Sequence, residues 1–290
     1  MLALTAAAIS DREFGLFRDM LHAAAGISLS PEKKVMVGGR LARRLRHYGL
    51  TSYGEYFKLL AGGDRAELQV ALDLLTTNET HFFREPKHFD FLRERLRRMR
   101  AGAHPVRAWS AASSSGEEAW SIAMTLAESL GARAWEVVGS DISSRVLDRA
   151  RAGIYERERI KTVPAQLLGK YFLRGIGGQE GKLQIAPELR ARVRFLQVNL
   201  NAPLPEIGKF DFIFLRNVMI YFDQSTKREV VARMLPLLKP EGRFIVGHSE
   251  SLHGVSEELA SIRPTIYCRE CRRSRRQRGS SGGAGAGGRR

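Results

Sequence analysis

Polar residues that could bind a nucleoside follow the apolar runs in the second half of the chain. Asp141 comes directly after WEVVGS, where a carboxylate commonly accepts hydrogen bonds from the vicinal hydroxyls of a ribose. Asp141 could instead cap a helix over 143–152, and the two roles would compete for the same oxygens. Asn199 and Leu200 follow VRFLQV, where an amide and an apolar side chain could frame an adenine ring.

Two further segments add to this candidate site. Small residues fill positions 110–115 before Gly116, so backbone N–H groups could approach a ligand closely, although the dinucleotide pattern G-x-G-x-x-G is absent. An ordinary turn is the alternative for that segment. Arg216 and Asn217 stand at the tip of the apolar run FDFIFL, where neither side chain suits a hydrophobic core.

A parallel sheet would bring these segments together. From residue 106 onwards β-type runs alternate with helical patterns, which predicts βαβ crossovers, a mostly parallel sheet and helices on both of its faces. We expect strands at 106–110, 135–140, 193–198, 210–215, 243–248 and 264–268. We expect helices at 86–100, 117–130, 143–152, 164–171 and 224–238. The polar segments should then meet beyond the carboxyl ends of the strands.

The rest of the chain divides by pattern into other units. Residues 1–75 carry repeated helical periodicity and predict a small helical bundle. Residues 76–268 form the α/β unit. Within it, residues 171–192 replace the expected alternation with Gly-rich turns and short alternating runs, which predicts a β-hairpin insertion. Residues 269–290 form an Arg/Gly tail that cannot bury enough apolar surface to become ordered.

Composition excludes several classes of protein. The 290 residues are 43% hydrophobic and 27% charged, which suits a full globular core, and no stretch approaches the ~20 apolar residues of a membrane span. The two cysteines, Cys268 and Cys271, are too few for a disulfide framework, so we expect a protein of the cytoplasm. They make only half of a zinc site, and we expect no metal.

The formal net charge of +16 has two sources. Residues 268–290 contribute +7, and residues 1–267 keep the remaining +9. Within the latter, Arg40, Arg43 and Arg44 follow helical spacing and would share one helix face. A basic stripe of that kind suits an acidic protein surface or a phosphate backbone equally well.

Five longer segments carry a resemblance to a known family. They read LTTNETHFFREPKHF (75–89), RAWSAASSSGEEAWSIAM (107–124), SDISSRVLDRARAGIY (140–155), RNVMIYFD (216–223) and GHSES (247–251). In this order they resemble the CheR family of chemotaxis receptor methyltransferases. The resemblance implies a class I S-adenosylmethionine-dependent transferase, with a Rossmann-like sheet, an N-terminal helical domain and a small inserted β-subdomain.

The resemblance also implies a reaction and a set of site residues. The reaction is esterification of glutamate side chains on the cytoplasmic helical bundle of chemoreceptors, with S-adenosylhomocysteine as the other product. Cofactor contacts carried over by position fall on Asn78, Thr80, Arg84, Glu118, Asp141, Asn199, Leu200, Arg216 and Asn217. Glu118 is favoured over its neighbour Glu117. Arg84 and Tyr221 match the positions near the transferred methyl group, and the arginine stripe would dock the Glu-rich receptor.

Methyl transfer to a glutamate needs no general base, because a carboxyl group with a pKa near 4.3 is already ionised at neutral pH. The motifs agree with this, since they contain no Cys nucleophile and no convincing His–carboxylate pair.

Two other functions are alternatives. One is a nucleic-acid methyltransferase, although the [D/N/S]-P-P-[Y/F] motif is replaced by Arg216-Asn217-Val218-Met219. The other is a non-catalytic cofactor-binding regulator. We expect no specific nucleic-acid partner, and contact with a membrane only through the receptor.

Overall fold

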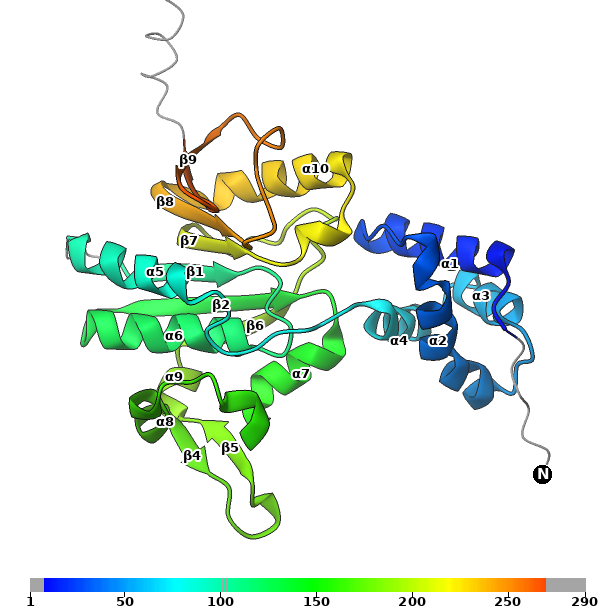
Figure 1. Ribbon diagram of the computed structural model, residues 1–290, viewed down its shortest axis with the longest axis horizontal. Coiled ribbons are helices and arrows are strands. Elements are labelled where there is room, and N and C mark those ends of the chain that lie inside the picture. The colour runs from blue at the N-terminus through cyan, green and yellow to red at the C-terminus, as the bar shows by residue number, and fades with distance from the viewer. Residues whose placement is uncertain (1–7, 101, 103, 270–290) are drawn as a thin grey trace, which may run out of the picture.

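The structure is a computed structural model that describes residues 8–100, 102 and 104–269. A bundle of helices comes first, and an extended segment after Leu75 leads from it into an α/β domain (Figure 1). The helices of the bundle are α1 (Asp11–Ala25), α2 (Lys34–Tyr48), α3 (Tyr53–Ala61) and α4 (Arg65–Leu75). The predicted helical bundle is confirmed.

Local sequence signals explain where these helices begin and end. The Ser10 side chain accepts the Glu13 N–H at 3.2 Å, and the Glu13 carboxylate accepts the Ser10 N–H at 2.9 Å, which makes a capping box at the start of α1. Gly26 and Gly49 end α1 and α2 with φ of 71° and 65°, a left-handed conformation that favours glycine. The boundaries of the bundle are therefore encoded by residues next to each other in the chain.

The central sheet has seven strands in the order β6-β2-β1-β7-β8-β10-β9. Their bounds are β1 (Val106–Ser110), β2 (Trp135–Asp141), β6 (Val193–Gln197), β7 (Phe210–Leu215), β8 (Leu238–Val246), β9 (Leu259–Arg263) and β10 (Ile266–Arg269). The strands from β6 to β8 run parallel, and β10 is antiparallel to both of its neighbours. The chain moves outward from β1 to β6 and returns beside β1 as β7, so the topological switch point lies between β1 and β7.

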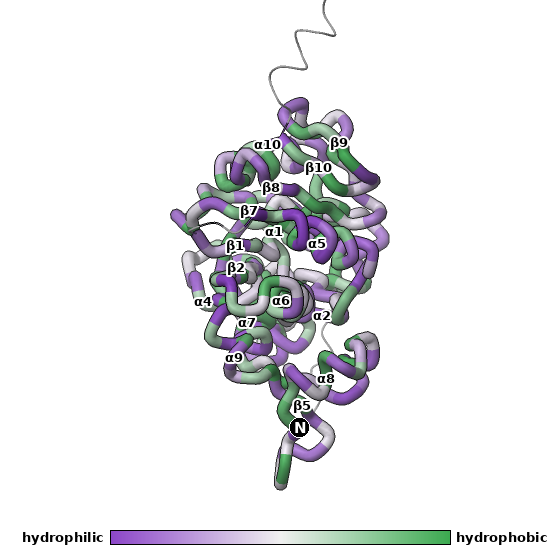
Figure 2. Tube along the Cα trace, turned by 90° about the vertical axis from the view of Figure 1, so that its left-hand side faces the viewer, coloured by the Kyte–Doolittle hydropathy of each residue, from purple (hydrophilic) through white to green (hydrophobic). Residues whose placement is uncertain are grey.

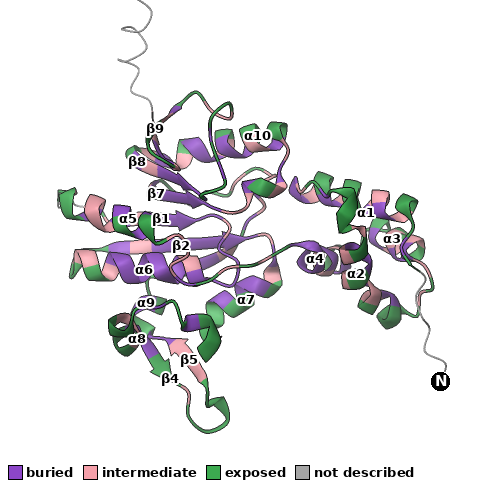
Figure 3. Cartoon of the chain, in the orientation of Figure 1, coloured by how far each residue is buried: buried purple, intermediate pink, exposed green. Residues whose placement is uncertain are grey.

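Helices cover both faces of this sheet, as predicted. They are α5 (Pro86–Arg98), α6 (Glu117–Leu130), α7 (Ser144–Ala152), α9 (Pro187–Arg190) and α10 (Gln224–Met234), whereas α8 (Ala165–Tyr171) belongs to the inserted subdomain (Figure 1). In β7, Phe212 and Phe214 join the core beneath α5 and α6, whereas Ile213 and Leu215 join the core beneath α10. The strands are consequently buried between layers of helix, whose outer faces are exposed (Figure 3) and, in α5, hydrophilic (Figure 2).

Five of the six predicted strands agree with the structure to within two residues at each end, while β8 begins five residues earlier than expected. Strand β9 is absent from the sequence prediction. It lies at the edge of the sheet and buries only Leu259 fully, so LASIR lacks the apolar run of an inner strand. Edge strands of this kind are difficult to recognise from hydrophobic pattern alone.

The inserted β-subdomain is larger than predicted. It is a three-stranded sheet in the order β3-β5-β4, with β3 (Ile154–Glu156), β4 (Phe172–Arg174) and β5 (Lys182–Ile185). Strands β4 and β5 form the expected antiparallel hairpin, but β3 precedes the predicted range 171–192. Its three residues are too few to show an alternating pattern, so only the tertiary pairing reveals it.

The C-terminal prediction is only partly open to comparison. Arg269, assigned to the tail, is the last residue of β10, and the remainder of the tail with Cys271 lies outside the described residues. Within the described part of the chain, the helices are all too short or too polar to span a membrane.

Candidate active site

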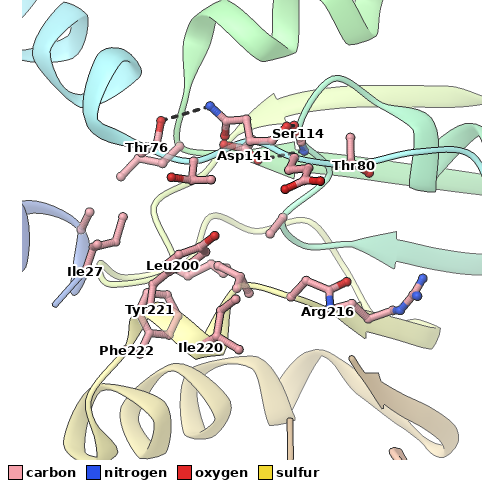
Figure 4. Close-up of a pocket in the computed structure, with 18 of the residues that line it drawn as sticks. Ile27, Thr76, Thr80, Ser114, Asp141, Leu200, Arg216, Ile220, Tyr221 and Phe222 are labelled. Carbon is pink, nitrogen blue, oxygen red and sulfur yellow. Dashed lines mark hydrogen bonds between the residues drawn. The ribbon is translucent and has the colours of Figure 1, made fainter. Parts of the chain in front are cut away.

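A cavity of about 410 Å³ lies where the helical bundle meets the carboxyl edge of the sheet. We call it the central cavity. All ten predicted cofactor and catalytic residues line it: Asn78, Thr80, Arg84, Glu118, Asp141, Asn199, Leu200, Arg216, Asn217 and Tyr221. Figure 4 shows Asp141 and Ser114 on one wall, with Leu200, Tyr221 and Phe222 across from them. The sheet therefore assembles the predicted set, while the contacts of each residue with a ligand stay predictions.

Asp141 ends strand β2 and is 8% exposed. Its Oδ2 accepts the Ser114 N–H at 2.9 Å, and its Oδ1 accepts the Ser143 N–H at 3.0 Å. Burial raises the pKa of Asp141, although these N–H donors oppose that shift. Because each carboxylate oxygen can accept a second hydrogen bond, Asp141 can still bind two hydroxyl groups from the cavity.

The alternative role of Asp141, as the cap of α7, belongs to Asp73 of the helical bundle. Asp73 ends up 7% exposed, and its carboxylate accepts the Ser144 N–H at 3.0 Å and the Arg145 N–H at 3.3 Å. The Arg145 guanidinium in turn donates to the Asp73 carbonyl at 2.9 Å. We call these contacts the Asp73 latch. It ties α4 to α7, which follows Asp141, so the N–H groups of Ser144 and Arg145 do not need the Asp141 oxygens.

Arg216 follows strand β7, and its side chain, 1% exposed, lies between two carboxylates. Its Nη1 donates to Glu118 Oε2 at 2.9 Å, and its Nη2 lies 2.9 Å from Glu85 Oε2 and donates to the Arg84 carbonyl at 2.6 Å. Burial would raise the pKa of Glu85, but the nearby Arg216 charge lowers it to about 2. The pKa of Glu118 is raised by burial. Glu85, which the sequence analysis did not select, thus belongs to the site through Arg216.

The acidic pair after Gly116 separates into two roles. Glu118 lines the central cavity, and its Oε1 accepts the Ser110 hydroxyl at 2.7 Å. Glu117 is fully buried and pairs with Arg159 outside the cavity lining. The structure therefore places Glu118, the favoured member, where a ligand could reach it.

Glu250 positions the loops after β7 and β8 and was also not selected from sequence. Its Oε2 accepts the N–H groups of Asn217 and Gly247, both at 2.7 Å, and its Oε1 accepts the Val218 N–H at 3.0 Å. Asn217 has a φ of 57°, an uncommon left-handed conformation for a residue with a side chain. Three charge-assisted hydrogen bonds to one buried carboxylate hold that conformation. The segment GHSES was the available signal for Glu250.

Backbone contacts with the helical bundle hold the segment that carries Tyr221, which ends a short 3-10 helix (Met219–Tyr221) after β7. The Ser28 N–H donates to the Tyr221 carbonyl at 2.8 Å, and Ile27 forms an isolated antiparallel bridge with Phe222. His22 of α1 lies 2.9 Å from Asp223, which caps α10. The loop between α1 and α2 thereby forms one wall of the cavity. No local sequence pattern predicted this role of the loop.

Asn199 also takes part in the contact between the two domains. Its amide donates to the Ala24 carbonyl at 2.6 Å, and its carbonyl oxygen accepts the Asn201 N–H at 2.9 Å. Asn199 lines the cavity, but its polar atoms already have protein partners. Its neighbour Leu200 offers the apolar surface expected for a ring.

The arginine stripe on α2 does not form the free basic face that its spacing predicts. Arg40 is half-buried and donates to the carbonyls of Leu75 and Thr76 at 2.9 and 3.1 Å. Arg44 donates to the buried Glu67 at 2.8 and 2.5 Å. Only Arg43 of the three is exposed. The prediction of three available charges is wrong for Arg40 and Arg44, because tertiary partners on α4 and in the linker take up their guanidinium groups.

Three His–carboxylate pairs among the described residues were missed as well, one of them between His248 and Glu85 at 3.9 Å. His88 Nδ1 lies 3.4 Å from Glu85 Oε2, and His22 pairs with Asp223. The His88–Glu85 pair has i, i+3 spacing at the start of α5, which could have indicated it; the other two pairs join residues distant in the chain.

Fold and cavity together define the class of protein. A sheet of five parallel strands, followed by the reversed strand β10 and the edge strand β9, with a cavity lined by the predicted cofactor residues at its switch point, is the class I methyltransferase fold, which binds S-adenosylmethionine.

Comparison with known proteins supplies the family. The model of the CheR methyltransferase SAM-binding domain matches residues 78–268, and that of the CheR methyltransferase all-alpha domain matches residues 12–76. The chain belongs to the CheR methyltransferase family and is an S-adenosylmethionine-dependent methyltransferase.

Individual relatives agree with this assignment. The chain is similar to the chemotaxis protein methyltransferase of Escherichia coli (strain K12), 45% identical over 264 residues that cover 90% of this chain and 91% of that protein. It is 45% identical to chemotaxis protein methyltransferase 2 of Pseudomonas aeruginosa over 258 residues, 88% of this chain and 92% of that protein. It is 36% identical to the chemotaxis protein methyltransferase of Borreliella burgdorferi over 254 residues, which cover 83% of this chain and 88% of that protein.

Proposed function

We propose that this methyltransferase works in the cytoplasm and esterifies glutamate side chains on the cytoplasmic helical bundle of chemoreceptors, as part of sensory adaptation in chemotaxis. The observation that carries the proposal is the convergence of all ten predicted residues on one cavity. The names of the relatives, which are chemotaxis protein methyltransferases, support the choice of pathway.

The residues around the central cavity fit S-adenosylmethionine. Its volume is within the range of small-molecule sites. Asp141 would hold the ribose hydroxyls, and Leu200 with Val198 would contact the adenine. Asn78, Thr80 and the polar group around Arg216 lie on the same lining and would hold the amino-acid end of the cofactor.

S-adenosylmethionine supplies an electrophilic methyl group on a sulfonium. The chain must then align an ionised glutamate with that methyl group and exclude water, which lowers the barrier through orientation rather than proton transfer. Arg84 and Tyr221 line the cavity and have the chemistry for this: a guanidinium to orient the incoming carboxylate, and a ring with a hydroxyl to shape its path. The wall formed by Ile27 and Ser28 would shield the reaction from solvent.

Docking of the receptor is proposed for the outer face of α2. Arg43 is exposed there, next to the exposed Arg46 and His47. Basic groups of this kind would steer an acidic receptor surface toward the cavity. Arg40 and Arg44 would contribute indirectly, since their internal bonds fix the orientation of α2.

The decisive experiment offers labelled S-adenosylmethionine and receptor cytoplasmic fragments to the full chain. Methyl groups released by alkali as methanol are expected, because carboxyl methyl esters are alkali-labile. Label that survives alkali would contradict the ester.

Single variants then test the site roles. Arg84→Ala and Tyr221→Phe should each lower kcat at least tenfold. In Tyr221→Phe the cofactor affinity should change less than threefold. Arg43→Glu should raise the KM for receptor and leave cofactor affinity unchanged. Full turnover in both Arg84→Ala and Tyr221→Phe would contradict the assigned roles.

A further inference from the structure

Three potential metal ligands lie together behind Arg216, outside the lining of the central cavity. They are Glu85, His88 and His248, and their ligand atoms all lie within 4.8 Å of one another. Glu85 Oε2 is 3.4 Å from His88 Nδ1 and 3.9 Å from His248 Nε2. Tetrahedral bonds of about 2.0–2.1 Å would place neighbouring ligand atoms about 3.4 Å apart, so small side-chain movements suffice to close around an ion.

His88 is arranged as a metal-ligating histidine usually is. It is 2% exposed, and its Nε2 lies 2.7 Å from the Thr265 hydroxyl. Its Nδ1 is buried and has no hydrogen-bond partner among the described residues, although it is directed at the cluster. A metal-bound imidazole typically has its second nitrogen fixed by a hydrogen bond, which is the role Thr265 fills.

Glu85 and His248 supply the other two positions. Glu85 is oriented by Arg216 at 2.9 Å and by the Asn217 amide at 3.2 Å, and ligating carboxylates are commonly held by such outer hydrogen bonds. The His248 side chain is 51% exposed, so the cluster is open to solvent on that side. An ion could enter there, and His248 has room to move toward it.

We propose that Glu85, His88 and His248 bind a divalent transition-metal ion of the zinc class. Two imidazoles and one carboxylate are the donors such ions prefer, and three protein ligands leave a coordination position open for water. The local charge is compatible with a cation, because Arg216 is outnumbered by the nearby carboxylates of Glu85 and Glu118.

Binding at this site would act on the cofactor. Glu85 shares its Oε2 between the cluster and Arg216, and Arg216 reaches Glu118 in the central cavity. A metal ion bound to the Glu85 carboxylate would weaken the ion pair between Glu85 and Arg216. The ion is therefore expected to reduce cofactor affinity and so to inhibit the enzyme reversibly.

The test is titration of the full chain with Co²⁺, followed by its visible absorption, in a background where Cys268→Ser and Cys271→Ser remove thiolate ligands. A saturable band is expected, and Zn²⁺ should displace it. His248→Ala should weaken Co²⁺ binding at least tenfold, because only the exposed ring is removed and the His248 N–H can still bond to Glu85. His253→Ala is the matched control, since His253 is exposed and outside the cluster.

A second measurement follows S-adenosylmethionine affinity by calorimetry with and without Zn²⁺. Affinity should fall at least threefold in the parent and in His253→Ala, and should stay unchanged in His248→Ala. No Co²⁺ band, or equal Co²⁺ affinity in His248→Ala and the parent, would overturn the site. Binding with unaltered cofactor affinity would overturn the link to Arg216. These readouts do not depend on methyl transfer, so they are separate from the test of the proposed function.

Discussion

Glu67 and Arg216, both buried, each lie in an Arg–Glu cluster, and the surroundings of these clusters differ. In the bundle, Glu67 is 4% exposed and accepts from Arg44, Tyr48 and Tyr56 at distances between 2.5 and 2.9 Å. In the α/β domain, Arg216 lies between Glu118 and Glu85 at the edge of the central cavity.

The difference lies in how complete each network is. The Glu67 cluster has a donor for each carboxylate oxygen, lies outside the lining of the central cavity and joins α2 to α4. The Arg216 Nε has no partner among the described residues, and its two carboxylates differ in the direction of their pKa shifts. A closed network of charges stabilises a fold, whereas an open one next to a cavity remains available to a ligand.

The largest effect is expected for Arg216→Met, which keeps the length of the side chain and removes its charge. Two buried carboxylates lose their partner, a cost of about 3–5 kcal/mol. Cofactor affinity measured by calorimetry should fall at least 100-fold. Arg44→Met is the matched control and should leave cofactor affinity within twofold; equal losses in the two variants would remove the distinction between the clusters.

Glu67→Ala should act on stability alone. It leaves Arg44 and two tyrosine hydroxyls without an acceptor, and the free energy of unfolding should fall by about 3 kcal/mol. Denaturant unfolding measures this. Glu229→Ala, which removes the exposed partner of Arg233, should cost less than about 1 kcal/mol. A similar cost for both would mean that the Glu67 cluster contributes little.

The Asp73 latch offers a link between the two regions. Asp73→Asn weakens the cap on α7, worth about 1 kcal/mol, and should reduce cofactor affinity by roughly threefold to tenfold because α7 follows Asp141. Asp64→Asn is the control, since Asp64 caps α4 within the bundle. Its effect should be confined to the unfolding midpoint; a change in cofactor affinity of equal size would contradict the latch.

The smallest expected effect is in the pH dependence of the free energy of unfolding. Burial would raise the pKa of Glu67, but its hydrogen bonds from Arg44 and the tyrosines lower it overall. The unfolded chain then binds the proton more readily, so this contribution to stability is present above a pH of about 4.5 and is lost as pH falls through the folded pKa. The pKa of Glu118 is raised, so its contribution has the opposite sign.

Unfolding measured between about pH 5 and pH 3 checks these signs. Glu67→Gln should flatten the decline in stability toward acid, and Glu118→Gln should steepen it. Identical slopes in the two variants would contradict the assigned shifts.

Much of the site could be predicted because its residues stand at fixed places in the strand pattern. Asp141 and Arg216 directly follow apolar runs, and parallel strands bring such positions to one edge. Glu85, Glu250 and Asp73 could not be predicted in this way, since each acts on a group brought near only by tertiary contacts.

The arginine stripe illustrates the same limit. Helical spacing placed Arg40, Arg43 and Arg44 on one face of α2. It could not show that Arg40 binds backbone carbonyls at the end of α4 and in the linker, or that Arg44 binds Glu67. Strand β3 is similar, because three residues acquire their meaning only by pairing with β5.

By itself the sequence determined the helical bundle, the parallel sheet, the residues at its carboxyl edge and the family. Those features depend on the periodicity of buried residues and on caps and turns. These signals involve residues close together in the chain, so they can be recognised in the sequence. The tertiary structure decided which charges are paired, how the loop after α1 closes the cavity and where Glu85, His88 and His248 meet. The choice of partner for a charge depends on which distant groups are desolvated beside it, and only the folded chain settles that.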